Sequence, residues 1–425
     1  MIRPTPFWRS VAVLGVAGLV LTACGGDDDG GTTAEPKDDT SSSAAPAKGD
    51  GTLKIGTLLP QTGSLAFLGP PEFAGVDLAL QDINDAGGVN GKQVEKTDSD
   101  SGDTSTDTAS QSVDRLLSNN VDAIVGAASS SVSLSVIDKI TGAGVVEISP
   151  ANTSDELTTY DDKGLYFRTA PPDVLQGRVL GDLILSDGNS TVGILALQDS
   201  YGTGLAESTT KSITDGGGEV VETVVYDPKA ASFSSEVGKI KAADPEAIAV
   251  IAFDETKKII PEMVKQGIGP DTKKIYFVDG NLASYEKDFP KGTLDGVKGT
   301  LPGVAASDEF KARLTDLKPD LTEFAYSPES YDATILVALA ATAAGDDSGE
   351  AIASQMQAVS EGGTKCTSYK ECVDLLKDDE DIDYDGVSGP VEFNDAGDPS
   401  EATIGIYQYG ADNNYTFLEG KAGKI

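Results

Sequence analysis

The chain has 425 residues, with 69 acidic residues against 32 basic ones, a formal net charge of −37 and no histidine. Without histidine, the sequence excludes Ser-His-Asp and Cys-His nucleophiles, imidazole general bases and His-ligated metal sites. So strong a negative charge also disfavours nucleic acid and anionic lipid headgroups as partners. We therefore expect neither an enzyme nor a protein that needs a cofactor.

The composition is that of an ordinary soluble globular protein. Hydrophobic residues make up 39% of the chain and charged residues 24%. A chain of this length is expected to form about two domains. The three cysteines fall unevenly, because Cys24 stands alone near the start while Cys366 and Cys372 lie close together near the end.

The first residues read as an export signal. Arg3 and Arg9 precede an apolar and glycine run at 11–21, which is too short to span a bilayer comfortably. The run ends in Leu21-Thr22-Ala23-Cys24, which resembles a bacterial lipobox. That resemblance implies cleavage of a signal peptide, residues 1–23, and attachment of lipid to Cys24. The alternative is a plain secretory signal with an accidental cysteine.

Residues 24–51 are rich in Gly, Ser, Thr, Ala and Asp and almost lack large apolar side chains. Such a segment cannot bury enough surface to offset the entropy of ordering, so it predicts a disordered acidic tether. The expected location is the outer face of the cytoplasmic membrane, with the lipid as the only membrane contact.

Beyond the tether, strand and helix patterns alternate, which is typical of parallel sheets covered by helices on both faces. A first series predicts strands at 53–59, 121–125 and 145–148 with helices at 72–85, 108–117 and 132–141. A second series predicts helices at 174–186, 204–214, 233–242 and 255–266 with strands at 191–197, 220–226, 247–251 and 275–278. Later come an apolar helix at 331–344 and short strands with Gly-rich turns at 389–409.

The expected fold is α/β, with two doubly wound parallel-sheet lobes joined by a hinge that the chain crosses several times. We assign residues 52–169 and 301–393 to one lobe, and 170–300 and 394–425 to the other. In open α/β sheets ligands lie beyond the carboxyl ends of the strands, so two facing lobes predict a cleft lined by the loops that follow strands.

Several stretches, taken together and in order, resemble the extracytoplasmic solute-binding proteins of branched-chain amino acid ABC transporters, the leucine/isoleucine/valine-binding type of the periplasmic binding protein type I fold. The resemblance covers nearly the whole chain beyond the tether. It rests on Leu59-Pro60-Gln61-Thr62-Gly63, Ile83-Asn84-Asp85-Ala86-Gly87-Gly88-Val89-Asn90-Gly91, Ala123-Ile124-Val125-Gly126, Asp199-Ser200-Tyr201-Gly202-Thr203-Gly204, Tyr331-Asp332-Ala333 and Gly386-Val387-Ser388-Gly389-Pro390-Val391-Glu392-Phe393.

In the first lobe, the resemblance implies residues that hold the carboxylate and the amine of an amino acid. Ser130 opens a helix after a strand, where backbone N–H groups and hydroxyls bind anions, so it is the candidate for a carboxylate. An ordinary N-cap is the alternative, and the two roles are compatible. In the loop after the next strand, Thr153 would offer its amide and hydroxyl and Ala151 its carbonyl.

In the second lobe, the resemblance places Asp279 against the ligand's ammonium group, and a desolvated carboxylate–ammonium pair is directional and discriminating. The alternative is a turn aspartate before glycine. Tyr201 is expected to cover the ligand with its ring, with a core tyrosine as the alternative. Phe253 and Leu68 are weaker candidates for the side-chain pocket, whose positions match the family poorly.

Two further motifs lie near the C-terminal end of the sequence. Residues 381–392 fit the calcium-loop pattern of EF-hands, but Gly389 and Pro390 stand where the exiting helix should begin, so an acidic loop leading into a strand is the favoured interpretation and no metal site is expected. Cys366 and Cys372, in an exported protein, predict a local disulfide.

The sequence as a whole predicts the monomeric substrate-binding component of an ABC importer, which captures a free amino acid with an aliphatic side chain and passes it to permease and ATPase subunits. Two alternatives stay open. One is a binding protein for another small solute, such as an amide, a urea-like compound, a polyamine or an aromatic acid. The other is a lipoprotein that senses a ligand and signals to a partner, since a fold does not fix a function.

Overall fold

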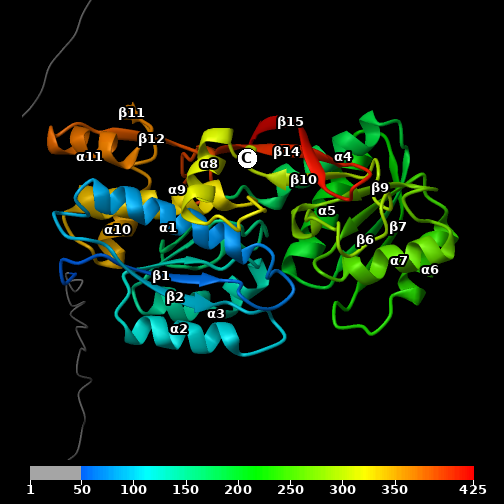
Figure 1. The fold of residues 1–425 in the computed structure, drawn as a ribbon, viewed down its shortest axis with the longest axis horizontal. Coiled ribbons are helices and arrows are strands. Elements are labelled where there is room, and N and C mark those ends of the chain that lie inside the picture. Colours follow the sequence, from blue (N-terminus) through cyan, green and yellow to red (C-terminus); the bar gives the residue numbers. More distant parts are fainter. Residues whose placement is uncertain (1–48) are drawn as a thin grey trace, which may run out of the picture. The chain divides into compact units, whose positions relative to one another are not determined.

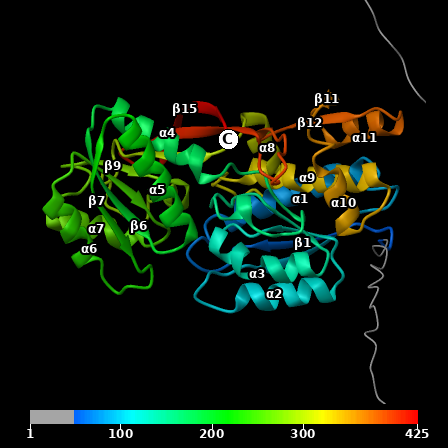
Figure 2. The same ribbon diagram turned by 180° about the vertical axis from the view of Figure 1, so that it is seen from behind.

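The computed structural model describes residues 49–425. The predicted signal peptide, Cys24 and nearly all of the predicted tether lie outside the described residues and stay predictions. The described residues form two α/β lobes side by side (Figures 1 and 2). Within them, no helix is both long enough and apolar enough to cross a membrane.

Lobe 1 is built on a five-stranded parallel sheet with the strand order β2-β1-β3-β4-β5. Helices α2 and α3 cover one face, while α1, α9 and α10 lie on the other (Figures 1 and 2). The strands are β1 Lys54–Leu59, β2 Glu95–Asp100, β3 Ala123–Gly126, β4 Val146–Ser149 and β5 Tyr166–Arg168. The helices are α1 Gly69–Asp85, α2 Thr108–Ser118, α3 Ser130–Gly142, α8 Asp308–Leu317, α9 Ser327–Ala344 and α10 Gly349–Met356.

Helix α9 is the centre of the lobe 1 core, because it is apolar on all sides and its residues 327–341 are all buried. It packs against α1, although more than two hundred residues separate them in the sequence (Figure 1). A helix that is hydrophobic all round has to be enclosed by other elements. Lobe 1 therefore needs the later part of the chain to complete its core.

Lobe 2 contains a seven-stranded sheet with the order β15-β14-β10-β9-β8-β6-β7, in which β14 is antiparallel to both of its neighbours, β10 and β15, and the other pairs are parallel. Helix α4 packs against α5, and α6 against α7. The strands are β6 Thr191–Leu197, β7 Glu219–Tyr226, β8 Ala247–Ile251, β9 Lys274–Phe277, β10 Lys298–Pro302, β14 Glu401–Tyr409 and β15 Tyr415–Lys424. The helices are α4 Asp173–Ser186, α5 Ser200–Asp215, α6 Ser234–Ala243 and α7 Thr256–Gln266.

The order of the strands shows where the chain passes between the lobes. It leaves lobe 1 after β5, returns after β10 to build α8, α9 and α10, and enters lobe 2 again for β14 and β15. Strand β10 stays paired with β14 as far as Pro302, two residues beyond the lobe boundary expected at 300. Repeated crossings of this kind form a hinge of several strands, about which two compact lobes can rotate.

A small third sheet, β11-β12-β13, lies at the outer end of lobe 1 beside α11 (Figure 1). Its elements are β11 Thr364–Cys366, α11 Tyr369–Lys377, β12 Ile382–Gly386 and β13 Gly389–Pro390. The calcium-loop motif falls on β12 and β13, and Asp383 and Asp385 pair with Lys365. Within the described residues, no group of three or more acidic or cysteine side chains could hold a metal ion.

The predicted disulfide is confirmed, because Cys366 and Cys372 are bonded and join β11 to α11. A loop this short removes little entropy from the unfolded chain. We expect the double variant Cys366→Ala/Cys372→Ala to lose only about 2 kcal/mol in its free energy of unfolding, measured with urea, against nearly 5 for a hundred-residue loop. A loss well beyond 3 kcal/mol would show that the bond holds more than this local loop.

Burial raises the pKa of four carboxyl groups into the neutral range. The pKa of Glu147 rises to about 8, that of Asp122 to about 7, and those of Asp332 and Asp199 to about 6. Each group therefore binds a proton in the folded state at a pH where the unfolded chain has already lost it. Under that condition stability falls as the pH rises.

We accordingly expect the free energy of unfolding to increase on acidification from pH 8 to pH 5, by up to about 1.4 kcal/mol per pH unit for each carboxyl that titrates only in the folded state. No histidine contributes, since the sequence has none. Urea unfolding across this range tests the slope. Acidification also stabilises an acidic chain by reducing the repulsion between its carboxylates. The variant Glu147→Gln distinguishes the two effects, because it should lose only the part of the pH dependence of the unfolding free energy near pH 8, where Glu147 titrates. A flat or opposite slope contradicts the expectation.

Candidate ligand-binding site

The lobe 1 side of the candidate site is the N-terminus of α3 and the loop after β4. Ser130, the first residue of α3, is 3% exposed, and its hydroxyl oxygen accepts hydrogen bonds from the backbone N–H groups of Thr153 and Ser154, both at 3.2 Å. Those bonds occupy the two lone pairs of the hydroxyl, which leaves its proton to donate. The contact also fixes the β4 loop against the helix.

A second set of bonds makes this loop rigid. The Ser149 hydroxyl donates to the carbonyl of Ala127 at 2.6 Å and accepts from the N–H groups of Ala151 and Asn152. Asn152 itself donates to the carbonyl of Ala127 at 2.9 Å. Thr153 is 1% exposed, and its hydroxyl has no hydrogen-bond partner among residues 49–425. A buried hydroxyl without a partner is costly, which suits a position that meets a ligand.

The lobe 2 side is centred on Asp279, which follows β9 in a 3₁₀ turn, Asp279–Asn281. Its carboxyl accepts hydrogen bonds from the Tyr201 hydroxyl at 2.7 Å, the Gln176 amide at 2.8 Å and the Tyr326 hydroxyl at 2.7 Å. Burial raises the pKa of Asp279, and the hydrogen bonds from Tyr201, Gln176 and Tyr326 oppose that rise by stabilising the ionised form. Three fixed donors therefore hold the carboxylate in one orientation.

Two aromatic rings cover the site from lobe 2. Tyr201, in the first turn of α5, stacks on Phe253, with ring centroids 5.4 Å apart and an interplanar angle of 11°. The helix begins earlier than the expected residue 204, because Asp199 accepts a hydrogen bond from the N–H of Gly202 at 2.7 Å and caps it. This cap places Tyr201 at the lobe interface.

All seven residues predicted from the sequence line one narrow cavity between the lobes. The cavity measures about 10 Å³, which is close to the 10–15 Å³ that one water molecule needs. An amino acid can therefore enter only if the lobes separate or the lining side chains move. The lining is Leu65, Leu68, Ala128, Ser129, Ser130, Ala151, Thr153, Tyr201, Phe253, Asp279, Gly280 and Tyr326.

Direct contacts join the lobes at the rim of this cavity. The Ser131 hydroxyl on α3 lies 2.9 Å from the Ser200 hydroxyl on α5 and donates to the Asp199 carboxyl at 3.3 Å. Across the cavity, the hydrogen bond from Tyr326, which precedes α9, to Asp279 in lobe 2 is a second link. The described arrangement is therefore the closed one.

Six residues of the site were not among the predicted ligand-binding residues: Leu65, Ala128, Ser129, Gly280 and Tyr326, which line the cavity, and Gln176, which holds Asp279. Leu65 lies in the loop after β1, and Tyr326 lies in the irregular loop before α9, where no periodic pattern marks a position. Gln176 could have been found, because a glutamine among the apolar residues of a predicted helix needs a hydrogen-bond partner if it is buried. It is fully buried, and its amide donates to Asp279 and Thr300.

Asp173 is a further buried carboxyl close to the site, at the start of α4. Its N–H donates to the Thr153 carbonyl at 2.7 Å, while neither of its carboxyl oxygens has a hydrogen-bond partner among the described residues. Burial raises its pKa well above the usual range, and the charges of Asp279 and Asp155 raise it further. Asp279, which has three donors, is therefore the better placed of the two to carry a negative charge.

The geometry defines a class of protein: two α/β lobes that meet at one cavity, with hydroxyl and N–H donors on one lobe and a carboxyl group on the other. The comparisons agree with this class. A model of the periplasmic binding protein family matches residues 52–365, and the chain belongs to that family. The proteins of this family bind solutes outside the cytoplasm.

Among the relatives, the "Leu/Ile/Val-binding protein homolog 1" of Brucella abortus is 26% identical over 378 residues, which are 86% of this chain and 93% of the relative. Two solved structures share the fold. The branched-chain amino acid transporter substrate-binding protein LivJ of Streptococcus pneumoniae, in complex with isoleucine, has a TM-score of 0.70 and 23% identity, and the match covers 88% of this chain and all of that one. A solute-binding protein of an R. palustris ABC transporter, in complex with benzoate, has a TM-score of 0.70 and 19% identity, with 88% and 97% covered.

Proposed function

We propose that this protein captures a free α-amino acid with an aliphatic side chain and delivers it to an ABC importer. The ligand's carboxylate accepts hydrogen bonds from Ser130 and Thr153 on lobe 1, and its ammonium pairs with Asp279 on lobe 2. Leu68 and Phe253 contact the side chain, and Tyr201 covers the ligand. Similarity to the Brucella protein named for Leu, Ile and Val, and to LivJ with isoleucine, supports this assignment.

One observation carries the proposal: hydrogen-bond donors and a carboxylate face one another across a single cavity, from opposite lobes. A zwitterion has the complementary pair of charges, so it can bridge the lobes. Such a ligand favours the closed arrangement by the difference between its affinities for the closed and open states. The backbone groups fixed by Ser149 and Asn152 keep the lobe 1 donors in place before the ligand arrives.

The site also argues against an aromatic acid, the ligand of the R. palustris neighbour. The carboxylate of a benzoate-like anion could accept hydrogen bonds from lobe 1. Its ring would then face the Asp279 carboxylate and would offer that carboxylate no positive charge. Burying an unpaired carboxylate against an apolar ring is unfavourable. An amine is therefore part of the proposed ligand.

In this proposal the protein performs no covalent chemistry. It stays attached to the outer face of the cytoplasmic membrane through lipid on Cys24, acts as a monomer, and presents its closed form to permease and ATPase subunits. The lobe boundaries proposed are 52–169 and 301–393 for lobe 1, and 170–300 and 394–425 for lobe 2. The strand pairings support this division to within two residues at β10.

A thermal-shift screen of the purified protein against all amino acids and common small amines and acids tests the function. A ligand that binds only the folded state raises the melting temperature, by RT ln(1 + [L]/Kd) in free energy. We expect leucine, isoleucine and valine to give the largest shifts. Small-angle scattering with the best ligand should show a smaller radius of gyration. Larger shifts with simple carboxylic acids than with any amino acid would contradict the proposal.

A further inference from the structure

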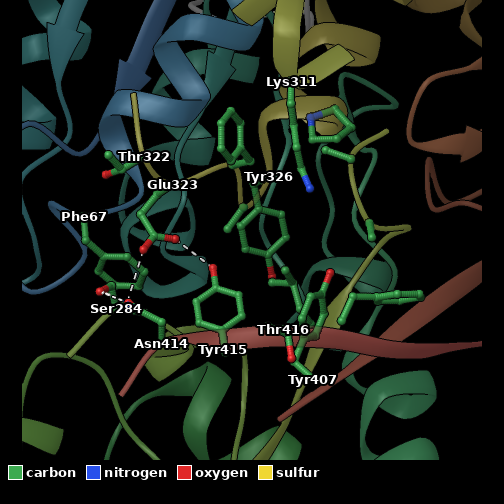
Figure 3. A pocket seen from close by; sticks show the side chains of 18 of the residues that line it. Phe67, Ser284, Lys311, Thr322, Glu323, Tyr326, Tyr407, Asn414, Tyr415 and Thr416 are labelled. Carbon is green, nitrogen blue, oxygen red and sulfur yellow. Dashed lines mark hydrogen bonds between the residues drawn. The ribbon is translucent and has the colours of Figure 1, made fainter. Parts of the chain in front are cut away.

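A second and much larger cavity lies beyond Tyr326, on the other side of that ring from the candidate site. Its volume is about 780 Å³, within the 300–1,000 Å³ that small-molecule sites occupy. Both lobes line it: Lys311, Glu323 and Tyr326 come from the lobe 1 side, while Ser284, Tyr407 and Tyr415 come from lobe 2 (Figure 3). None of the residues proposed to bind the amino acid lines this cavity.

The walls are aromatic. Six rings line the cavity, and Tyr407 contacts both Tyr415 and Phe417 edge to face, each with ring centroids 5.5 Å apart. The face of an aromatic ring attracts cations, and Lys311 already places its ammonium 5.7 Å from the centroid of the Phe324 ring. The six rings belong to Phe67, Phe324, Tyr326, Tyr407, Tyr415 and Phe417.

Four carboxyl side chains, Glu286, Asp288, Glu323 and Glu329, and two lysines line the walls. Glu329 is the informative one. It is 2% exposed, and its Oε1 atom has no hydrogen-bond partner among residues 49–425. Burial raises the pKa of Glu329 well above its usual range, and an ammonium group beside it would lower that pKa and favour the carboxylate. A buried carboxyl without a partner is expensive, and an ammonium group offers both charge and donors.

We propose that this cavity is a second ligand site, which takes an organic cation consisting of an amine on an aromatic or apolar body. The amine pairs with Glu329, and the body lies against the rings of Tyr407, Tyr415 and Phe417. The cavity is distinct from the amino acid site, since the Tyr326 ring separates the two and its hydroxyl donates to Asp279 at 2.7 Å.

Binding at the two sites is expected to be coupled, because residues of both lobes line the second cavity and bond to one another in the closed arrangement. The Glu323 carboxyl, from the lobe 1 side, accepts hydrogen bonds from the Tyr415 hydroxyl at 2.7 Å and from the N–H of Ser284 at 3.2 Å, both in lobe 2 (Figure 3). Opening the lobes separates these groups and the cavity walls. A cation held between the walls therefore favours closure, and each ligand raises the affinity of the other by the same factor.

The probe is 2-phenylethylamine, which is a cation at pH 7, and its matched control is the neutral 2-phenylethanol. Calorimetry on the purified protein saturated with leucine is expected to show the amine binding at least tenfold more tightly than the alcohol. Conversely, saturating amine is expected to tighten leucine binding by about fivefold, at the lower end of usual coupling. The measurement of coupling rests on the proposed function, because it assumes that leucine binds at the first site. Titration of the amine in the absence of leucine tests the second site independently of that function.

Variants place the probe in the cavity. Glu329→Gln is expected to weaken the amine at least tenfold and leave the alcohol unchanged. If this variant does not fold, Phe417→Ala serves instead, since Phe417 is 46% exposed and its truncation should spare the fold while weakening both probes. Glu350→Gln, on the exposed surface of α10, is the matched control. Equal affinity for amine and alcohol, unchanged affinity in the cavity variants, or displacement of the amine by leucine would overturn the proposal.

Discussion

Replacing Asp279 by asparagine is expected to weaken leucine binding by two to three orders of magnitude. The carboxylate is enclosed between Gln176, Tyr201 and Tyr326 and is proposed to face the ligand's ammonium in a cavity closed to solvent. Removing one partner of such a buried, hydrogen-bonded charge pair costs about 2–5 kcal/mol, which is equivalent to roughly thirtyfold or more in the dissociation constant. Calorimetry with leucine measures the loss.

The same variant is expected to treat the 2-oxo analogue of leucine differently. This analogue has no ammonium group, so the native protein should bind it poorly, and Asp279→Asn should bind it equally well or better because a carboxylate is no longer opposed to it. Damage to the cleft would weaken both ligands in the variant, whereas loss of the charge pair weakens only leucine. Comparing the two ligands on the two proteins therefore measures the charge pair by itself, as a double-mutant cycle does. Equal affinity of the native protein for leucine and its 2-oxo analogue would remove Asp279 from the proposed role.

Asp254→Asn is the matched control, because Asp254 is an exposed aspartate of the same lobe that pairs with Lys257 at the surface. Exposed pairs contribute little, so leucine binding should be unchanged. The Asp279 variant should also keep its melting temperature without ligand, since asparagine can still accept hydrogen bonds from Tyr201 and Gln176. A large fall in melting temperature would mean that Asp279 serves the fold rather than the ligand.

The predicted residues line one cavity because the sequence pattern already places them in loops at the carboxyl ends of parallel strands. Ser130, Thr153 and Asp279 each follow a strand that periodicity reveals, and the carboxyl ends of parallel strands face the same edge. Leu65 also follows a predicted strand, but no pattern distinguishes it from the other residues of its loop, and Tyr326 precedes a helix instead of following a strand. The positions of the residues are therefore explained by topology, while their role in binding stays a proposal.

Two of the strands that were missed share a physical reason. Strand β2, with the sequence Glu-Lys-Thr-Asp-Ser-Asp, is at the edge of its sheet and largely solvated, so it has no apolar pattern. Strand β15 is another edge strand whose side chains are mostly exposed. Backbone hydrogen bonds pair β2 with β1 and β15 with β14, and apolar patterns along the sequence do not report such bonds. Buried strands such as β6 and β8 were predicted at their observed bounds.

The ion pair of Arg168 and Asp398 is expected to have the largest effect on stability. Both side chains are fully buried where the chain passes between the lobes, with the Arg168 Nε atom 2.5 Å from a carboxyl oxygen of Asp398. Arg168 also donates to the carbonyls of Asn152 at 3.3 Å and Ser154 at 2.9 Å, on either side of Thr153. One guanidinium thus supports both the hinge and the ligand-binding loop.

Arg168→Met leaves the Asp398 carboxylate buried without its partner, which typically costs 3–5 kcal/mol. Urea unfolding should show that loss in the free energy of unfolding, and calorimetry should show weaker leucine binding, because the loop around Thr153 loses two hydrogen bonds. Arg178→Met is the control, since Arg178 is exposed on α4 and its side chain donates one hydrogen bond among the described residues, to the carbonyl of Lys424.

The double variant Arg168→Met/Asp398→Leu separates the two roles of the arginine. Replacing both members of a buried pair by apolar residues often restores stability, because no uncompensated charge remains. We expect most of the lost stability to return, while leucine binding stays weak because Asn152 and Ser154 still lack their donor. Full recovery of binding together with stability would show that the loop around Thr153 holds its shape without Arg168, and that this residue serves the hinge alone.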